Sequence, residues 1–153
     1  MNLDIDRILL IAEARINVTE CPPNTNSGKA VEAYQATTGN RRGDAWCASF
    51  VADCGKTAYG AVWPLPLSGY VQSLYVWADK RKLITTAPVR GSVFLIWHPE
   101  LSRFAHTGFC LDDAGATIEG NTSGGGVREG WGVFSRVRKW AAEDRFISGW
   151  WTI

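Results

Sequence analysis

The chain has 153 residues, of which 46% are hydrophobic and 20% are charged, and its formal net charge is +1. These values are ordinary for a globular protein with one core, and they give no reason to expect nucleic acid as a partner. Four irregularly spaced cysteines without a C-x-x-C pair exclude a disulfide scaffold and a zinc ribbon. Two histidines exclude a three-histidine metal site.

The N-terminal segment carries no export signal. Asp4 and Asp6 precede a short apolar run at residues 8–12, whereas a signal peptide needs a basic start and a longer apolar stretch. No apolar run approaches the roughly 20 residues that span a bilayer. We therefore expect synthesis in the cytoplasm, no stable membrane insertion, and any action outside the cytoplasm only after release or delivery.

The first half of the sequence has helical spacing. Apolar residues on one face predict a helix from Asp4 to about residue 16, which the Pro22-Pro23 segment ends. Ser27 is placed to cap a second helix that closes at Gly39. A further helix is expected at about residues 70–82.

Between these lies a helix predicted at about residues 45–59, with Asp44 as its cap. Cys47 falls in the first turn of this helix. Unpaired backbone amides and the positive end of the helix dipole favour a thiolate there. Trp46, beside the cysteine, either walls a groove or anchors the helix.

The second half changes to strand periodicity. Strands are predicted at residues 92–97, 105–111, 116–121, 132–140 and 146–153, with a hairpin turn at 112–115 and a glycine-rich loop at 122–126. His98 precedes a proline in a loop and is expected to be exposed. Helices followed by an antiparallel meander predict an α+β fold, with residues 1–153 as a single domain.

The hairpin brings polar side chains together. A four-residue loop would place Cys110 opposite Thr117, so that Glu119 becomes the diagonal neighbour of His106 on the same face. Gly108, opposite Glu119, leaves room, and Asn121 lies opposite His106. A slip of one residue would send His106 to the other face.

A cysteine nucleophile needs a base, a group that orients the base, and donors for an oxyanion. With Cys47 as the nucleophile, His106 would be the base and either Glu119 or Asn121 the orienting group, and the amide of Cys47 is a candidate oxyanion donor. The alternative is structural: a cysteine on an apolar helix is usually a small buried hydrophobe. Cys21, Cys54 and Cys110 are interpreted in this way.

Four segments resemble the cysteine, histidine-dependent amidohydrolase/peptidase (CHAP) domains. They are Trp46-Cys47-Ala48-Ser49-Phe50-Val51, Arg90-Gly91-Ser92-Val93-Phe94, Ala105-His106-Thr107-Gly108-Phe109 and Ile118-Glu119-Gly120-Asn121, in the order of that family. Ser92 stands where the family usually has Asp, which should affect only local capping. The basic stretch at residues 40–42 differs from the acidic calcium loop of some members, so no metal or cofactor is expected.

The resemblance implies a papain-like fold, with N-terminal helices packed on a C-terminal antiparallel sheet. It implies Cys47 as nucleophile, His106 as general base, Glu119 as orienting group and Asn121 as an auxiliary polar residue. The implied substrate is bacterial peptidoglycan, cut at an amide bond by an endopeptidase or amidase. A single catalytic domain without a separate wall-binding domain, acting as a monomer, is typical of a phage endolysin.

Three alternatives stay open at this point. An injected antibacterial amidase toxin would have the same site. A non-catalytic wall-binding or phage structural module could keep the fold, and a cysteine peptidase or transglutaminase-like enzyme acting on proteins would share the triad. Four tryptophans are candidates for the substrate groove: Trp46, Trp63, Trp97 and Trp131.

Overall fold

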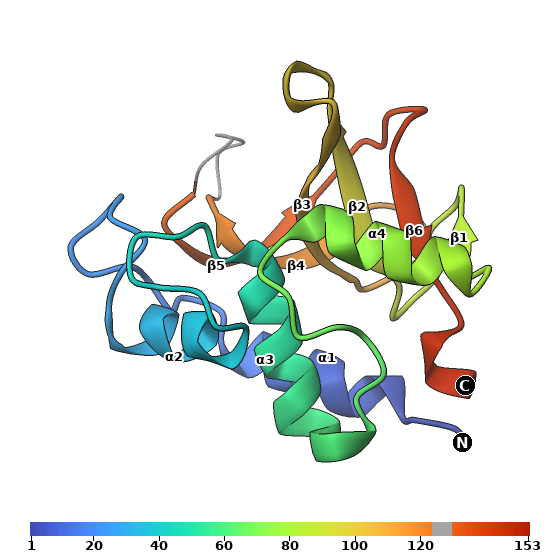
Figure 1. The fold of residues 1–153 in the computed structure, drawn as a ribbon, viewed down its shortest axis with the longest axis horizontal. Helices are drawn as coiled ribbons and strands as arrows, with labels where there is room; N and C mark the ends of the chain where they lie inside the picture. Colours follow the sequence, from blue (N-terminus) through green and yellow to red (C-terminus); the bar gives the residue numbers. More distant parts are fainter. Residues whose placement is uncertain (124–129) are drawn as a thin grey trace.

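The computed structural model describes residues 1–123 and 130–153, and within these ranges helices come first and an antiparallel sheet follows (Figure 1). The helices are α1 (Ile5–Ala14), α2 (Lys29–Thr37), α3 (Cys47–Tyr59) and α4 (Val71–Lys80). The strands are β1 (Ile84–Thr85), β2 (Val93–His98), β3 (Arg103–Cys110), β4 (Ala116–Thr122), β5 (Gly132–Val137) and β6 (Arg145–Ile147). The predicted α+β class is confirmed.

The sheet has the strand order β1-β6-β2-β3-β4-β5, and every neighbouring pair is antiparallel. Alternation along β2 separates two apolar clusters. Val93 and Leu95 belong to the main core with the helices, whereas Phe94 packs with Cys110 and Phe146 in a smaller cluster. The first half of β2 is therefore apolar on both faces.

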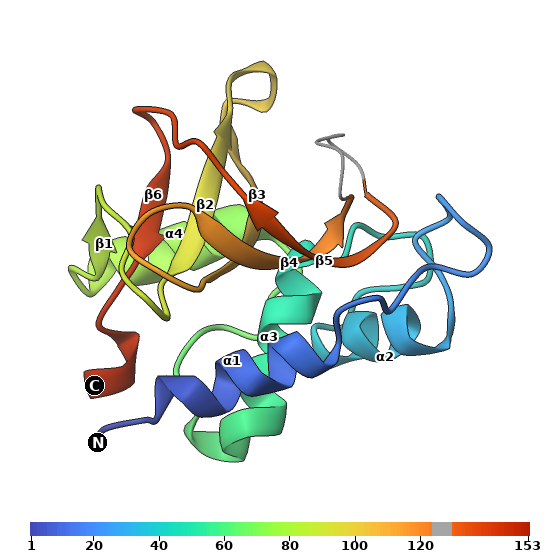
Figure 2. The ribbon, with the colours of Figure 1, turned by 180° about the vertical axis from the view of Figure 1, so that it is seen from behind.

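The helices lie around this sheet in different ways. In Figure 1, α4 crosses in front of the strands, and α3 runs down from the sheet beside α1. Figure 2 shows the reverse view, with α1 in front and the chain ends close together. The amide of Leu3 donates to the carbonyl of Trp151 at 2.8 Å, which joins the two ends. α3 contacts both β3 and β4, and α4 contacts β3.

Two predicted helix caps are wrong. α2 begins after Gly28, whose φ of 120° is a backbone conformation that glycine adopts readily. The backbone amide of Gly28 donates to the Glu32 carboxylate at 3.0 Å. Ser27 instead donates to the carbonyl of Cys21. α3 begins at Cys47 itself, with Trp46 at the N-cap position and no side-chain cap. Asp44 lies too early in the chain to cap it, and accepts from the amide of Arg41 at 2.7 Å.

The predicted strands are present but several bounds differ. β5 ends at Val137, and β6 covers three residues before a 3-10 turn at Trp150–Thr152 takes over. The turn at 112–115 is held by Asp112, whose carboxylate accepts from the amides of Ala114 and Ala116. Of the predicted glycine-rich loop, residues 124–126 lie outside the described residues.

Ser92 closes the turn before β2. Its hydroxyl accepts from the amide of Val89 at 3.1 Å and shares a hydrogen bond with Ser148 at 2.8 Å. The residue that departs from the resemblance therefore acts in local capping, as expected.

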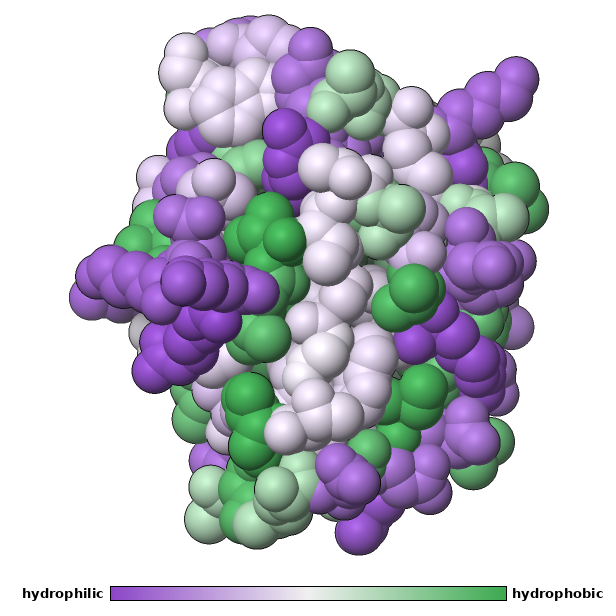
Figure 3. All heavy atoms as spheres, turned by 90° about the vertical axis from the view of Figure 1, so that its right-hand side faces the viewer, coloured by the Kyte–Doolittle hydropathy of each residue, from purple (hydrophilic) through white to green (hydrophobic). Residues whose placement is uncertain are grey.

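The face that carries β1 and the chain ends has a mixed surface. Figure 3 shows a central band of intermediate hydropathy flanked by hydrophobic residues, with hydrophilic residues at the margins. Across residues 1–123 and 130–153, no helix combines the length and the apolar character that a membrane crossing requires.

Candidate active site

Cys47 is the first residue of α3, and buried neighbours fix its position. Trp46 is fully buried; its indole N–H donates to the Glu20 carboxylate at 2.9 Å and its ring packs on Tyr34. The side-chain Nε2 of Gln35 donates to the carbonyl of Asp44 at 2.8 Å, which holds the chain just before the helix. Of the two open interpretations of Trp46, the anchoring one is therefore confirmed.

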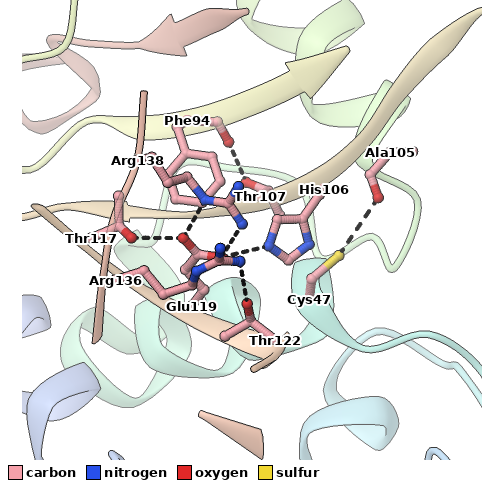
Figure 4. Close-up of polar contacts among 10 residues, drawn as sticks. All are labelled: Cys47, Phe94, Ala105, His106, Thr107, Thr117, Glu119, Thr122, Arg136 and Arg138. Atoms are coloured by element: carbon pink, nitrogen blue, oxygen red, sulfur yellow. Dashed lines mark hydrogen bonds and ion pairs between the residues drawn. The ribbon is translucent and has the colours of Figure 1, made fainter. Parts of the chain in front are cut away.

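His106 lies on β3 beside the sulfur. Its Nε2 is 2.7 Å from Glu119 Oε1, and Figure 4 shows the other ring nitrogen on the side of Cys47. Because a carboxylate only accepts, Nε2 carries a hydrogen, which directs Nδ1 to the thiol. The Cys47 sulfur is also 4.0 Å from the carbonyl oxygen of Ala105.

The hairpin register matches the prediction. Cys110 pairs with Thr117, and Phe109 pairs with Ile118. A Cβ at Gly108 would lie 2.6 Å from the carbonyl oxygen of Ile118, so only glycine fits there. At Gly120, a Cβ would lie 2.6 Å from the Cβ of Phe50 on α3. The two glycines let β3, β4 and the first turn of α3 come close enough for the three side chains to meet.

Glu119 is fully buried and has four hydrogen-bond donors (Figure 4). Arg138 donates to both carboxylate oxygens, through Nε to Oε2 and through Nη2 to Oε1 at 2.6 Å. Thr117 donates to Oε2 at 2.6 Å, and His106 completes the set. A bidentate arginine fixes the plane of the carboxylate, and with it the direction in which the imidazole points.

The pKa values of His106 and Glu119 are shifted in the directions expected of an ion pair. Burial lowers the pKa of His106, but the hydrogen bonds and charges of Cys47 and Glu119 outweigh burial and raise the pKa to about 9. Burial raises the pKa of Glu119, but the hydrogen bonds from Arg138 and His106 outweigh it and hold this pKa well below its usual range. The geometry therefore favours an imidazolium next to an ionised carboxylate.

Asn121 borders the same site from β4. It has a φ of 53°, which asparagine tolerates, at the irregularity where the pairing of β4 with β5 shifts. Its side-chain oxygen is buried and has no hydrogen-bond partner within the described residues. It lines a cavity together with Cys47 and His106. Between the two predicted orienting groups, Glu119 is the one that bonds to His106.

Two hollows flank the sulfur. One, of about 440 Å³, lies between residues 38–45 and 67–71, and the other, of about 140 Å³, extends toward His98 and Asn121. Cys47, Arg103 and Ala105 line both. An extended substrate that occupied both hollows would cross the sulfur between them.

The prediction that His98 is exposed is wrong. His98 ends β2, its side chain is only 17% exposed, and its Nδ1 lies 3.1 Å from Glu100 Oε1. Because β2 continues through His98, up to Pro99, the His98 side chain lies at the smaller hollow and not in an exposed loop.

The predicted groove tryptophans do not line the two hollows. Trp46 and Trp63 are buried, and Trp97 packs edge-on against Phe104. Trp131 is 40% exposed and packs edge-on against Phe134.

The other cysteines have different surroundings. Cys54 and Cys110 are buried as predicted, and burial raises the pKa of each thiol to about 12. Cys21 is exposed, contrary to the prediction, because it lies in the irregular segment beside two prolines rather than on a helix. Across the described part of the chain, no three His, Cys, Asp or Glu side chains gather as a metal site would require.

Sequence reasoning missed Arg138, Gln35 and Arg103. Arg138 directly follows β5, and its backbone amide donates to the carbonyl of Gly115, just before β4 begins. In the β4–β5 ladder Glu119 pairs instead with Phe134, four residues before Arg138. The side chain reaches Glu119 by folding back across the face, which strand alternation does not reveal. A buried carboxylate on a predicted strand does require a cation, and that rule would have prompted a search of the neighbouring strand.

The chain matches no protein-family model, no curated protein and no solved structure. The likeness to CHAP domains therefore depends on the four sequence segments alone.

Proposed function

We propose that the chain is a cysteine-dependent hydrolase that cuts an amide bond of bacterial peptidoglycan. The observation that carries the proposal is the line of contacts from Cys47 through His106 to Glu119, with Glu119 buried, ionised and held by Arg138. The peptidoglycan substrate is supported by the resemblance of the motifs to CHAP domains.

In the proposed reaction the Cys47 thiolate attacks the amide carbonyl. The backbone amide of Cys47, in the first turn of α3 where amides have no partner within the helix, stabilises the oxyanion. His106 then gives its proton to the leaving amine. A water molecule, deprotonated by His106, attacks the thioester and releases the acid and the free thiol. Throughout, Glu119 keeps the imidazole in one orientation and stabilises its positive form.

A non-catalytic module of the same fold would have no use for this arrangement. Burying a carboxylate costs free energy that a structural role recovers only through its partners, and apolar replacements often do as well. Two hollows that meet at the sulfur also favour chemistry over simple packing. The thiol would be the reacting group in either an endolysin or a delivered toxin.

The test is Cys47→Ala in a peptidoglycan clearance assay, with Cys54→Ala as the matched control. The first variant should lose clearance, and the control should keep it because Cys54 packs in the core. Mass spectrometry of the released fragments identifies the bond that is cut. Clearance by Cys47→Ala at the parent rate would exclude the mechanism.

Alkylation tests the thiol without any substrate. In a Cys21→Ser background, which removes the exposed thiol, iodoacetamide at neutral pH should label Cys47 well before Cys54 and Cys110. Equal and slow labelling of all three would support the non-catalytic alternative.

If synthetic protein substrates were cleaved and peptidoglycan were not, the chain would instead be a peptidase acting on proteins.

A further inference from the structure

Arg103 lies beside the candidate nucleophile, at the two hollows described above. It is the first residue of β3, and it lines both hollows that flank the Cys47 sulfur. In the β2–β3 ladder it pairs with His98, which lines the smaller hollow. Any substrate that reaches the sulfur from either side therefore passes a guanidinium group.

The guanidinium is held in place but not neutralised. It lies over the ring of Tyr70, 4.9 Å from the centroid, and Nη1 donates to the carbonyl of Phe104 at 3.2 Å. The amide of Phe104 donates to Gln72 at 2.9 Å, which ties the start of β3 to α4. Four of the five N–H donors of Arg103 then have no protein acceptor in residues 1–123 and 130–153.

The arginines that pair with carboxylates in the described parts of the chain are Arg15, Arg90 and Arg138, not Arg103. Among residues 1–123 and 130–153, Asp44 is the one acidic residue that lines either hollow, and its carboxylate accepts from the amide of Arg41. Within the described part of the chain, Arg103 is thus a positive charge without a paired carboxylate, and it lies beside the hollows where a ligand would bind.

We propose that Arg103 binds a free carboxylate of the substrate close to the amide that Cys47 attacks, so that the enzyme selects anionic peptides. The inference rests on the proposed hydrolase function and adds the chemistry by which the substrate is chosen. A planar guanidinium pairs with a carboxylate through two parallel hydrogen bonds, whereas a carboxamide offers one acceptor oxygen and no charge. Stacking on Tyr70 lowers the cost of ordering the side chain.

The test compares synthetic peptidoglycan stem peptides that differ at one group. One carries free carboxylates, one has the in-chain carboxylate beside the cleaved bond replaced by a carboxamide, and one has only its C-terminal carboxylate amidated. The wild-type kcat/KM should fall about tenfold or more for the amidated peptide whose carboxylate Arg103 binds, mainly through KM. The other amidated peptide should behave as the free acid, which identifies the source of the carboxylate.

Arg103→Gln should abolish this preference, so that the free-acid peptide and both amidated peptides are cleaved with equal kcat/KM. Arg103→Lys should retain part of it, because the charge remains but the paired hydrogen bonds do not. Arg7→Gln is the matched control: it makes the same change in charge on the exposed side of α1 and should behave as wild type. Equal cleavage of all three peptides by the wild type, or an unchanged preference in Arg103→Gln, would overturn the proposal.

Failure of the hydrolase function can be separated from failure of this proposal. Affinities of the three peptides for Cys47→Ala, with and without Arg103→Gln, are measured by calorimetry and need no turnover. A carboxylate preference that disappears with Arg103→Gln supports the binding role even where the wild type cleaves no peptide. No preference in this background refutes it.

Discussion

Replacing Glu119 by Gln should lower the pKa of His106, and nuclear magnetic resonance can measure this directly. The chain has two histidines, so the ring signals of His106 are assigned by comparison with a His98→Gln variant. In the wild type, His106 should titrate with a pKa of about 9. The measurement needs no substrate and tests the charge arrangement by itself.

The size of the effect follows from the contacts. Glu119 lies 2.7 Å from Nε2 and is fully buried, so little water screens its charge. An opposite charge at such a distance typically changes a pKa by about 1–3. Since burial alone lowers the pKa of His106, removal of the carboxylate should move the titration below about 8.

Two further variants keep the result interpretable. Thr117→Val removes one hydrogen bond to Glu119 but leaves its charge, so the pKa of His106 should hardly change. Glu119→Gln leaves the Arg138 charge without its partner, which can cost about 3–5 kcal/mol of stability. The double variant Glu119→Gln/Arg138→Gln removes both charges and should show the same low pKa. A His106 that still titrates near 9 in both variants that lack the Glu119 carboxylate would refute the reasoning.

Three other predictions concern stability, measured by urea unfolding. Arg138→Met should cost about 3–5 kcal/mol because it leaves the buried charge of Glu119 without a partner. Arg90→Met, which breaks an exposed ion pair with Asp6, should cost less than about 1 kcal/mol. Equal losses in the two variants would contradict the stabilising role of the buried pair. Gly108→Ala should cost about 1–3 kcal/mol, because the new methyl would lie 2.6 Å from a carbonyl oxygen of β4, and a neutral effect would mean that the strands separate freely. The folded pKa of His106 is raised, so its stabilisation is complete below its ordinary value of 6.5 and is lost as pH rises through about 9. The pKa of Glu119 is lowered, so its stabilisation is present above about 4.5 and is lost as pH falls. Stability should therefore be greatest between about pH 4.5 and 6.5. His106→Gln should remove the alkaline loss and weaken the acid loss, because Glu119 then lacks one of the groups that lower its pKa.

The hairpin could be predicted because its signals are local. The acidic-glycine turn at 112–115 fixes the register, and strand alternation then determines which side chains share a face. The contact between His106 and Glu119 follows from these two facts, without knowledge of the rest of the fold. Helix periods in the first half were similarly sufficient to locate α1, α3 and α4 to within a few residues.

Helix starts and buried partners could not be predicted in the same way. Asp44 and Ser27 are both good capping residues, but a nearby backbone amide or carbonyl takes their side chains instead. Gly28 and Trp46 occupy the cap positions because tertiary contacts fix the chain there. Capping propensity describes what an isolated residue favours. Where several neighbouring residues could occupy the N-cap position, tertiary packing determines which one does.

The accuracy of the site depends on buried polar residues that lie outside the recognisable motifs. Cys47 is placed by Glu20 and Gln35, through Trp46 and the backbone before α3, whereas His106 is placed by Arg138 through Glu119. The two sets come from opposite halves of the chain, and the groups that they position meet where α3 contacts β3 and β4. Since an error of about 1 Å between nucleophile and base can cost a hundredfold in rate, substitutions at these supporting positions should reduce turnover even when the triad itself is intact.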